Sequence, residues 1–248
     1  DERLLSTPAL ALMQCKNQAV KMAKAAQNAL KLSLEAVTNY TPDIEKHIRK
    51  DEELTDHYED LLGTYLIKLS SQKMSTEDSE SSAEILKLIG DFERIADHAV
   101  NILESSMELR EKNLTLSEKA VRDYEVMKEA VEDILNMSMS SYIDSDIEKA
   151  FSVEPLEQVI DGLKDNLRDR HILRMQKGEC SIEAGFVWSD LLTDMERVSD
   201  HCSNIAGCVI ETKQHELNLH ESLGKARLQT EEFGEKFREF NKKYMVEQ

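Results

Sequence analysis

One polar motif with helical spacing occurs twice in this chain, 103 residues apart, over residues 91–102 and 194–205. Seven positions carry the same residue type in both copies: Asp91, Glu93, Arg94, Asp97, His98, Asn101 and Ile102 in the first, and Asp194, Glu196, Arg197, Asp200, His201, Asn204 and Ile205 in the second. A hydrophobic core requires only apolar residues at the right spacing. A repeated polar set therefore indicates a duplicated unit and constrains the whole fold.

The repeat continues on the N-terminal side of this motif. With a shift of 105 residues, Glu52, Asp56 and Asp60 align with Glu157, Asp161 and Asp165. The change from 105 to 103 requires only a two-residue difference in one loop. Each repeat therefore holds at least two equivalent helices as well as the loop between them.

Helical periodicity runs through nearly the whole chain, and it is interrupted at polar, Pro- or Gly-containing segments. We predict helices over about residues 8–40, 44–70, 82–111, 117–142, 147–176 and 181–215, and a final amphipathic helix within 216–248. The predicted fold is all-α: two tandem antiparallel three-helix bundles, at residues 1–113 and 114–215, followed by a C-terminal helix at 216–248.

The charge of the chain restricts its partners. Lys and Arg total 31 against 49 Asp and Glu, which gives a formal net charge of -18. Such a surface repels a nucleic-acid backbone and attracts cations, so we expect no nucleic-acid partner. No apolar run approaches the roughly 20 residues of a membrane-spanning helix. The chain begins at Asp1 rather than Met, as a fragment of a longer protein would.

The repeated motif predicts a metal site. Glu93, Asp97 and Asn101 fall within a sector of about 80° on a helical wheel, away from the apolar stripe. Carboxylates also recur one turn apart on the preceding helix of each repeat. All-oxygen ligands suit Mg, Ca, Mn or Fe. We expect Glu93, Asp97, Glu196 and Asp200 to be the principal ligands of a divalent or trivalent cation, with Asn101, Asn204, Asp56 and Asp161 in support.

The same residues have a simpler interpretation, which the sequence leaves open. Acidic residues four apart usually form a solvated helix face, and Arg94 can pair with Asp97 at i,i+3. Like charges one turn apart are mildly unfavourable, however, and they are kept in both copies. His98 and His201 lie at the edge of the polar sector, where we expect each to bond a neighbouring helix rather than a metal.

Nothing in the sequence indicates an enzyme. None of the seven histidines has Glu three residues before it, as the ferritin-like di-iron oxidases require. No nucleophile elbow, phosphate-binding loop or zinc signature is present either. We therefore predict a binding or regulatory role.

The segment Glu-Arg-x-x-Asp-His-x-x-Asn, on the third helix of a duplicated three-helix unit, resembles the PhoU family of regulators of phosphate uptake. Members of that family bind iron, zinc or similar ions at Glu/Asp-x-x-x-Asp motifs, which are matched here by Glu93 with Asp97 and by Glu196 with Asp200. The resemblance thus implies Fe, Mn, Zn or Mg at these residues, and phosphate-uptake components as partners.

Two further segments, residues 1–12 and 171–185, resemble the cytoplasmic C-terminal region of bacterial sodium-dependent phosphate cotransporters. That resemblance implies a regulatory domain on the cytoplasmic side of the membrane, soluble as a fragment, whose partner is a membrane transport domain of the same polypeptide. The alternatives are a stand-alone PhoU-type regulator and a purely structural helical module. A homodimer is also possible. The first repeat has Leu69 at the position of Arg174, so the two halves are expected to differ in any metal site.

Overall fold

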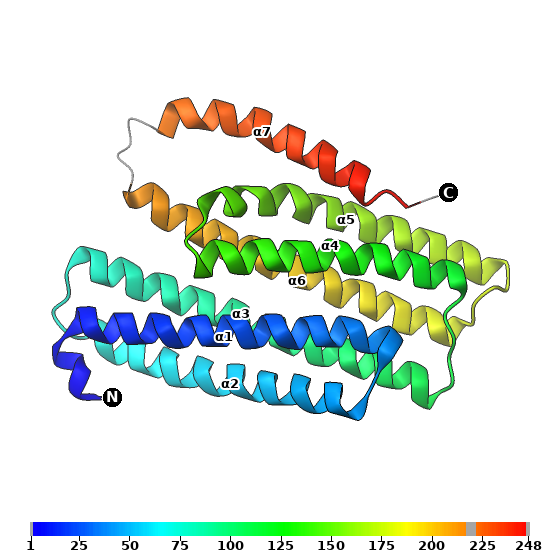
Figure 1. Cartoon of the computed structure of the whole chain (residues 1–248), viewed down its shortest axis with the longest axis horizontal. Coiled ribbons are helices and arrows are strands. Elements are labelled where there is room, and N and C mark those ends of the chain that lie inside the picture. Colours follow the sequence, from blue (N-terminus) through cyan, green and yellow to red (C-terminus); the bar gives the residue numbers. More distant parts are fainter. Residues whose placement is uncertain (1, 217–221, 247–248) are drawn as a thin grey trace.

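The structure, a computed structural model, describes residues 2–216 and 222–246. It consists of one short 3-10 helix and α-helices throughout this part of the chain (Figure 1). The elements are η1 (Glu2–Ser6), α1 (Pro8–Asn39), α2 (Pro42–Ser70), α3 (Thr76–Glu111), α4 (Glu118–Ile143), α5 (Ile147–Gln176), α6 (Ile182–Glu216) and α7 (Ser222–Lys243). The prediction of an all-α fold is confirmed.

Capping side chains set where the helices begin. The Thr41 hydroxyl accepts a hydrogen bond from the Ile44 amide at 3.2 Å, and the Ser117 hydroxyl accepts one from the Ala120 amide at 3.2 Å. Ser75 caps α3 in the same way. The third helix therefore begins at Thr76, several residues before the predicted start near residue 82, because the Ser75 hydroxyl accepts a hydrogen bond from the Asp78 amide in its first turn.

The helices form two bundles that face each other. Helices α1, α2 and α3 pack together, and so do α4, α5 and α6. The third helix of each half, α3 and α6, forms the main contact between the halves (Figure 1). The predicted pair of three-helix bundles is therefore present, with the two copies of the polar motif on the two central helices.

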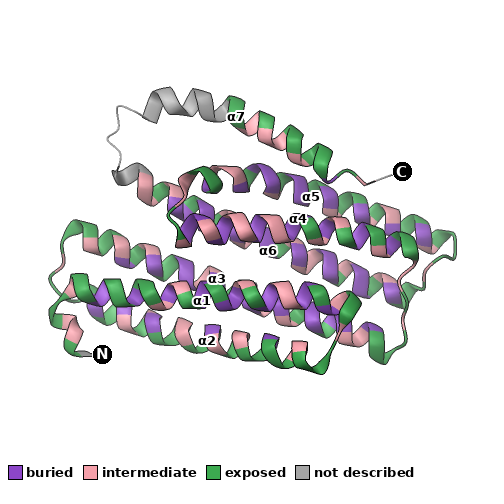
Figure 2. Ribbon diagram, in the orientation of Figure 1, coloured by how far each residue is buried: buried purple, intermediate pink, exposed green. Residues whose placement is uncertain are grey.

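The two bundles share one hydrophobic core. Phe92 and Ile95 on α3, and Met195 and Val198 on α6, are fully buried, and they belong to a single cluster that spans both halves. Figure 2 shows that buried residues alternate with intermediate and exposed ones along the packed helices. None of the described helices has a stretch long and apolar enough to cross a bilayer.

The C-terminal helix α7 packs on α5. Lys236 Nζ donates to Ser152 Oγ at 2.8 Å, and Lys243 Nζ lies 2.7 Å from Asp133 Oδ2 on α4. The amphipathic helix predicted within 216–248 is thus present over Ser222–Lys243, and residues 217–221 and 247–248 lie outside the described part. The helix covers the second half and leaves the equivalent face of the first half without a counterpart in the described chain.

Candidate metal site and the interface between the halves

Carboxylates from α2 and α3 converge in the first half, as the sequence predicts. Burial raises the pKa of Glu93 to about 7, and Asp97 adds to this through its charge and a hydrogen bond, with a smaller contribution from Glu59. The pKa of Glu52 is also raised, by burial, then by Asp97 and then by Asp56. Such mutual effects require short distances between the charges. The first half therefore holds an anionic group of side chains that a cation would stabilise.

The structure changes which α2 carboxylates are the better candidates for the acidic group. Asp56, predicted as a supporting ligand, is exposed, whereas Glu52 and Glu59 are half-buried. Glu59 was not among the predicted residues, although it lies seven positions after Glu52 and so falls on the same side of the helix. This spacing of two helical turns could have identified Glu59 from the sequence.

Most carboxylates of this group have equivalents in the second half. Burial raises the pKa of Glu157 to about 7, with contributions from Glu154, then Asp200, Asp161 and Glu196. The pKa of Asp200 is raised by burial and then by Glu196, while Arg197 lowers it. Asp161 is exposed, like Asp56 in the first half.

Two aligned pairs distinguish the surroundings of the two acidic groups. The first is Arg49, which lowers the pKa of Glu52, against Glu154, which raises that of Glu157; the second is Glu59 against Lys164. Lys164 Nζ lies 3.0 Å from Glu196 Oε2, and the two side chains are only 15% and 13% exposed. The residue at the equivalent position of the first half, 105 residues earlier, is Glu59. The second half thus carries a built-in ammonium group where the first half has a further carboxylate.

The simpler interpretation of the motif is partly confirmed. Arg94 Nη1 lies 3.4 Å from Asp97 Oδ2, and Arg197 Nη1 lies 3.3 Å from Asp200 Oδ2. Both arginine side chains are more than half exposed, so each pair contributes little to stability. These arginines sit at the rim of the acidic groups and offset only part of their charge.

Asn101 and Asn204, predicted as supporting ligands, are engaged elsewhere. The Asn101 amide donates to Asp194 Oδ1 across the α3–α6 contact, and the Asn204 amide donates to Asp91 Oδ1, both at 3.2 Å. They lie at the interface between the halves, because the crossing of α3 and α6 turns their side chains toward the opposite helix.

The histidines of the motif meet the same two carboxylates. His98 Nδ1 lies 2.8 Å from Asp194 Oδ1, and His201 Nδ1 lies 2.9 Å from Asp91 Oδ1. The prediction that each histidine bonds a neighbouring helix is confirmed. Sequence reasoning gave Asp91 and Asp194 no role. Their spacing of seven residues from His98 and His201, which places them on the same helix face, was the available signal.

The carboxylates do not form a finished coordination sphere. Among the described residues, no three or more His, Cys, Asp or Glu side chains are placed so as to hold a metal ion together. The donor chemistry of the first half, with clustered carboxylates and raised pKa values, nevertheless fits a hard or intermediate cation. In the second half the Lys164 ammonium already supplies a positive charge.

The segment 171–185 forms a buried polar network with no equivalent in the first half. Arg174 Nη1 lies 2.5 Å from Asp123 Oδ2, and both side chains are 5% exposed or less. The His171 and Trp188 rings stack at 5.4 Å, and burial lowers the pKa of His171 to about 4. The equivalent positions in the first half are Gln18, Leu66, Leu69 and Ile85.

Two glycines of this segment have structural roles. Gly178 follows the end of α5 with a φ of +70°, which favours glycine. At Gly185, a Cβ atom would lie 2.5 Å from Met175 Sδ, so a larger residue requires the flexible Met175 side chain to move. The motif is therefore explained by packing of the α5–α6 hairpin.

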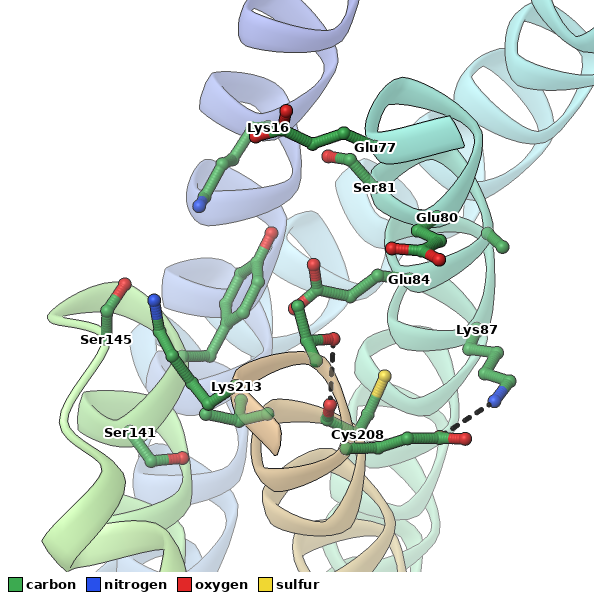
Figure 3. Close-up of a pocket in the computed structure, with 15 residues that line it drawn as sticks. Lys16, Glu77, Glu80, Ser81, Glu84, Lys87, Ser141, Ser145, Cys208 and Lys213 are labelled. Carbon is green, nitrogen blue, oxygen red and sulfur yellow. Dashed lines mark hydrogen bonds and ion pairs between the residues drawn. The ribbon is translucent and has the colours of Figure 1, made fainter. Parts of the chain in front are cut away.

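A cavity of about 310 Å³ lies at one end of the contact between the halves, lined by α1, α3, α4 and α6 (Figure 3). Its labelled residues include Lys16, Glu80 and Glu84, and Lys87 donates to Glu211 at 3.2 Å. Both signs of charge line it, and none of the predicted metal ligands does. The cavity is therefore separate from the candidate metal site.

Comparison with known proteins decides the family. The model of the PhoU domain matches residues 19–106 and 124–209, one match in each half. The chain belongs to the PhoU family.

Individual relatives of this PhoU-family chain differ in length. The chain is 30% identical over 132 residues to "Phosphate-specific transport system accessory protein PhoU homolog 1" of Thermotoga maritima, covering 51% of this chain and 53% of that protein. It is 24% identical to "Putative inorganic phosphate export protein YjbB" of Salmonella typhimurium, covering 85% of this chain and 39% of that protein. It thus spans about half of the first relative and about two fifths of the second.

Another relative, the "Phosphate-specific transport system accessory protein PhoU homolog" of Clostridium acetobutylicum, is 20% identical and is covered over 95% of its length. Two solved structures share the fold. The crystal structure of PhoU from Streptococcus pneumoniae gives a TM-score of 0.72 at 18% identity, with 86% of this chain and 99% of that chain covered. PhoU from Pseudomonas aeruginosa gives 0.67 at 19% identity with the same coverage.

Proposed function

We propose that this chain is a PhoU-type regulator of phosphate transport whose first half binds one divalent or trivalent cation. The observation that carries the regulatory role is the family match in both halves, together with relatives named as accessory proteins of phosphate-specific transport. A regulator needs no catalytic residues, and we expect no enzymatic activity. Its partners would be components of a phosphate transport system.

The cation site is supported by the charge of the first half. The pKa values of Glu93 and Glu52 are both raised, by burial and then by the charge of Asp97, while Arg94 lowers that of Glu93 and Arg49 lowers that of Glu52. A bound Mn, Fe, Zn or Mg ion would replace the proton that Glu93 otherwise retains near neutral pH. We propose Glu93 and Asp97 as principal ligands and Glu52 and Glu59 as additional ones.

In the second half, Glu196 and Asp200 were expected to bind a cation in the same way. Lys164 offsets part of their negative charge and would compete with a metal for Glu196. We therefore propose that this half binds a cation more weakly or requires Lys164 to move away.

Thermal melting with Mn, Fe, Zn or Mg ions, and with a chelator, tests the cation site, since a ligand specific to the folded state raises the melting temperature. We expect Glu93→Gln with Asp97→Asn to abolish the response, and the matched pair Glu196→Gln with Asp200→Asn to keep most of it. A response that survives the first pair would place the site elsewhere.

The regulatory role is tested separately in a bacterium that lacks its own PhoU. Expression of this chain should restore control of phosphate uptake when phosphate is plentiful. A folded, expressed chain that leaves uptake unregulated would contradict the role, whatever the metal result.

A second candidate function is a regulatory domain on the cytoplasmic side of a membrane phosphate transporter, as part of the same polypeptide. It is supported by the match to the export protein YjbB, which covers 85% of this chain but only 39% of that protein. The gene sequence upstream of Asp1 separates the two candidates: membrane helices encoded there would favour the transporter, and their absence would favour the separate regulator. A homodimer stays a proposal that sedimentation can test.

A further inference from the structure

The two repeated histidines lie next to each other at the centre of the molecule. His98 on α3 and His201 on α6 come from opposite halves, and their ring centres are 5.6 Å apart. Their side chains are 18% and 20% exposed. This pair is formed only when the two halves pack, and the proposed carboxylate site does not use it.

The partners of each ring fix its hydrogen positions. Asp194 Oδ1 receives the Asn101 amide and lies 2.8 Å from His98 Nδ1. An ionised carboxylate can only accept, so His98 Nδ1 carries a hydrogen and donates. In a neutral imidazole, Nε2 then has a bare lone pair. The same reasoning applies to His201, whose Nδ1 lies 2.9 Å from Asp91 Oδ1.

Imidazoles held by carboxylates in this way are typical of metal ligands, because the second-shell partner fixes the ring orientation and raises the basicity of the free nitrogen. A metal bonded at about 2.0–2.1 Å to one nitrogen lies roughly 3 Å from the centre of that ring. Two rings on one metal are then roughly 5–6 Å apart between centres. The observed 5.6 Å falls within this range.

We propose that His98 and His201 form a two-histidine site for a copper, nickel or zinc ion, bound through Nε2 of each ring, with solvent completing the coordination. Imidazole nitrogen suits these metals, whereas the clustered carboxylates suit harder cations. Copper and nickel would therefore distinguish the histidine pair from the carboxylates, whereas zinc suits both. A metal on His98 and His201 would link α3 to α6 and so hold the two halves together.

Electron paramagnetic resonance of the full chain with one equivalent of Cu(II) tests the ligands directly. We expect nitrogen hyperfine coupling from two imidazoles. Titration calorimetry with Ni(II) should show that His98→Gln and His201→Gln each weaken binding at least tenfold. Each single variant keeps only one imidazole, which does not make a site by itself. The double variant should therefore bind Ni(II) only a little more weakly than either single variant.

The matched controls are His47→Gln and His57→Gln, at exposed histidines on α2. They should leave the Cu(II) spectrum and the Ni(II) affinity unchanged. Glutamine at position 98 or 201 can still donate to Asp194 or Asp91, so the fold should be kept. The Cu(II) spectrum of the unmodified chain tests the imidazole ligands without any substitution. Absence of nitrogen coupling, unchanged affinity in both variants, or an equal loss in the controls would overturn the proposal.

Discussion

The two halves of the molecule have equivalent helices, yet their acidic groups differ at two aligned positions: Glu59 against Lys164, and Arg49 against Glu154. The first half has Glu59 facing Glu93, and the second has Lys164 at 3.0 Å from Glu196. At the Glu59/Lys164 position a negative charge in the first half is replaced by a positive one in the second, and the reverse holds for Arg49 and Glu154. We propose that Lys164, which already pairs with Glu196, reduces the need of the second group for a cation from solution.

The halves also differ in whether they bury an ion pair. The second half buries Asp123 and Arg174 where the first has Gln18 and Leu69. A buried ion pair tolerates loss of one partner badly, because the remaining charge is left without compensation. The second half is therefore more sensitive to single polar substitutions than the first.

The largest expected effect follows from this difference. Asp123→Ala should lower the free energy of unfolding by about 3–5 kcal/mol, since Arg174 then stays buried without its carboxylate. The matched change in the first half, Gln18→Ala, should cost under about 1 kcal/mol. Denaturant unfolding of both variants measures this. Equal losses would show that the buried ion pair is not special to the second half.

Exchanging the residues at the Glu59/Lys164 position should exchange the behaviour of the acidic groups. Glu59→Lys should weaken cation binding on the order of a hundredfold, because a carboxylate near the ion becomes an ammonium. Lys164→Glu should create a second site of similar strength in the other half. Titration calorimetry of the single variants and of the double variant reports number and affinity of sites. A Glu59→Lys chain with unchanged affinity would contradict the assigned site.

The pH dependence of stability should report the raised pKa of Glu93, about 7 against an ordinary value of 4.5. Between these values the folded chain binds more protons than the unfolded chain, so stability falls as pH rises toward about 7. In metal-free protein, Glu93→Gln should remove on the order of 1–3 kcal/mol of this variation. Glu157→Gln should act alike in the second half, where the pKa is also about 7.

The measurement is urea unfolding at several pH values between 5 and 8 in the presence of a chelator. Saturating Mn(II) should flatten the dependence that Glu93 causes and leave the part due to Glu157. A slope that Glu93→Gln does not change would mean that the Glu93 proton is not retained in the folded chain.

The smallest effect is expected where the halves are alike. Arg94→Ala and Arg197→Ala should each change stability by about 0.5 kcal/mol or less, because both ion pairs are exposed and lie at 3.4 and 3.3 Å. Thermal melts of the two variants should agree with each other. A large loss in only one half would show that its arginine does more than pair at the surface.

Much of this molecule could be predicted from its sequence. The repeat, the helical periodicity and its interruptions at polar, Pro- or Gly-containing segments predicted an all-α fold with three helices in each half, because these signals are local. The i,i+4 spacing also placed Glu93 with Asp97, and Glu196 with Asp200, on one helix face. The start of α3 was predicted too late. Residues 76–81 are all polar and show no apolar periodicity, although Ser75 caps the helix.

The tertiary structure decided which residues meet across helices. Spacing along one helix cannot reveal that Asn101 bonds Asp194, that Lys164 reaches Glu196, or that His98 lies beside His201, because each contact depends on how two helices cross. The sequence by itself determined the helices, their polar faces and the family resemblance. Only the packing of α2 on α3, α5 on α6 and α3 on α6 decided which charges share a site and which hold the halves together.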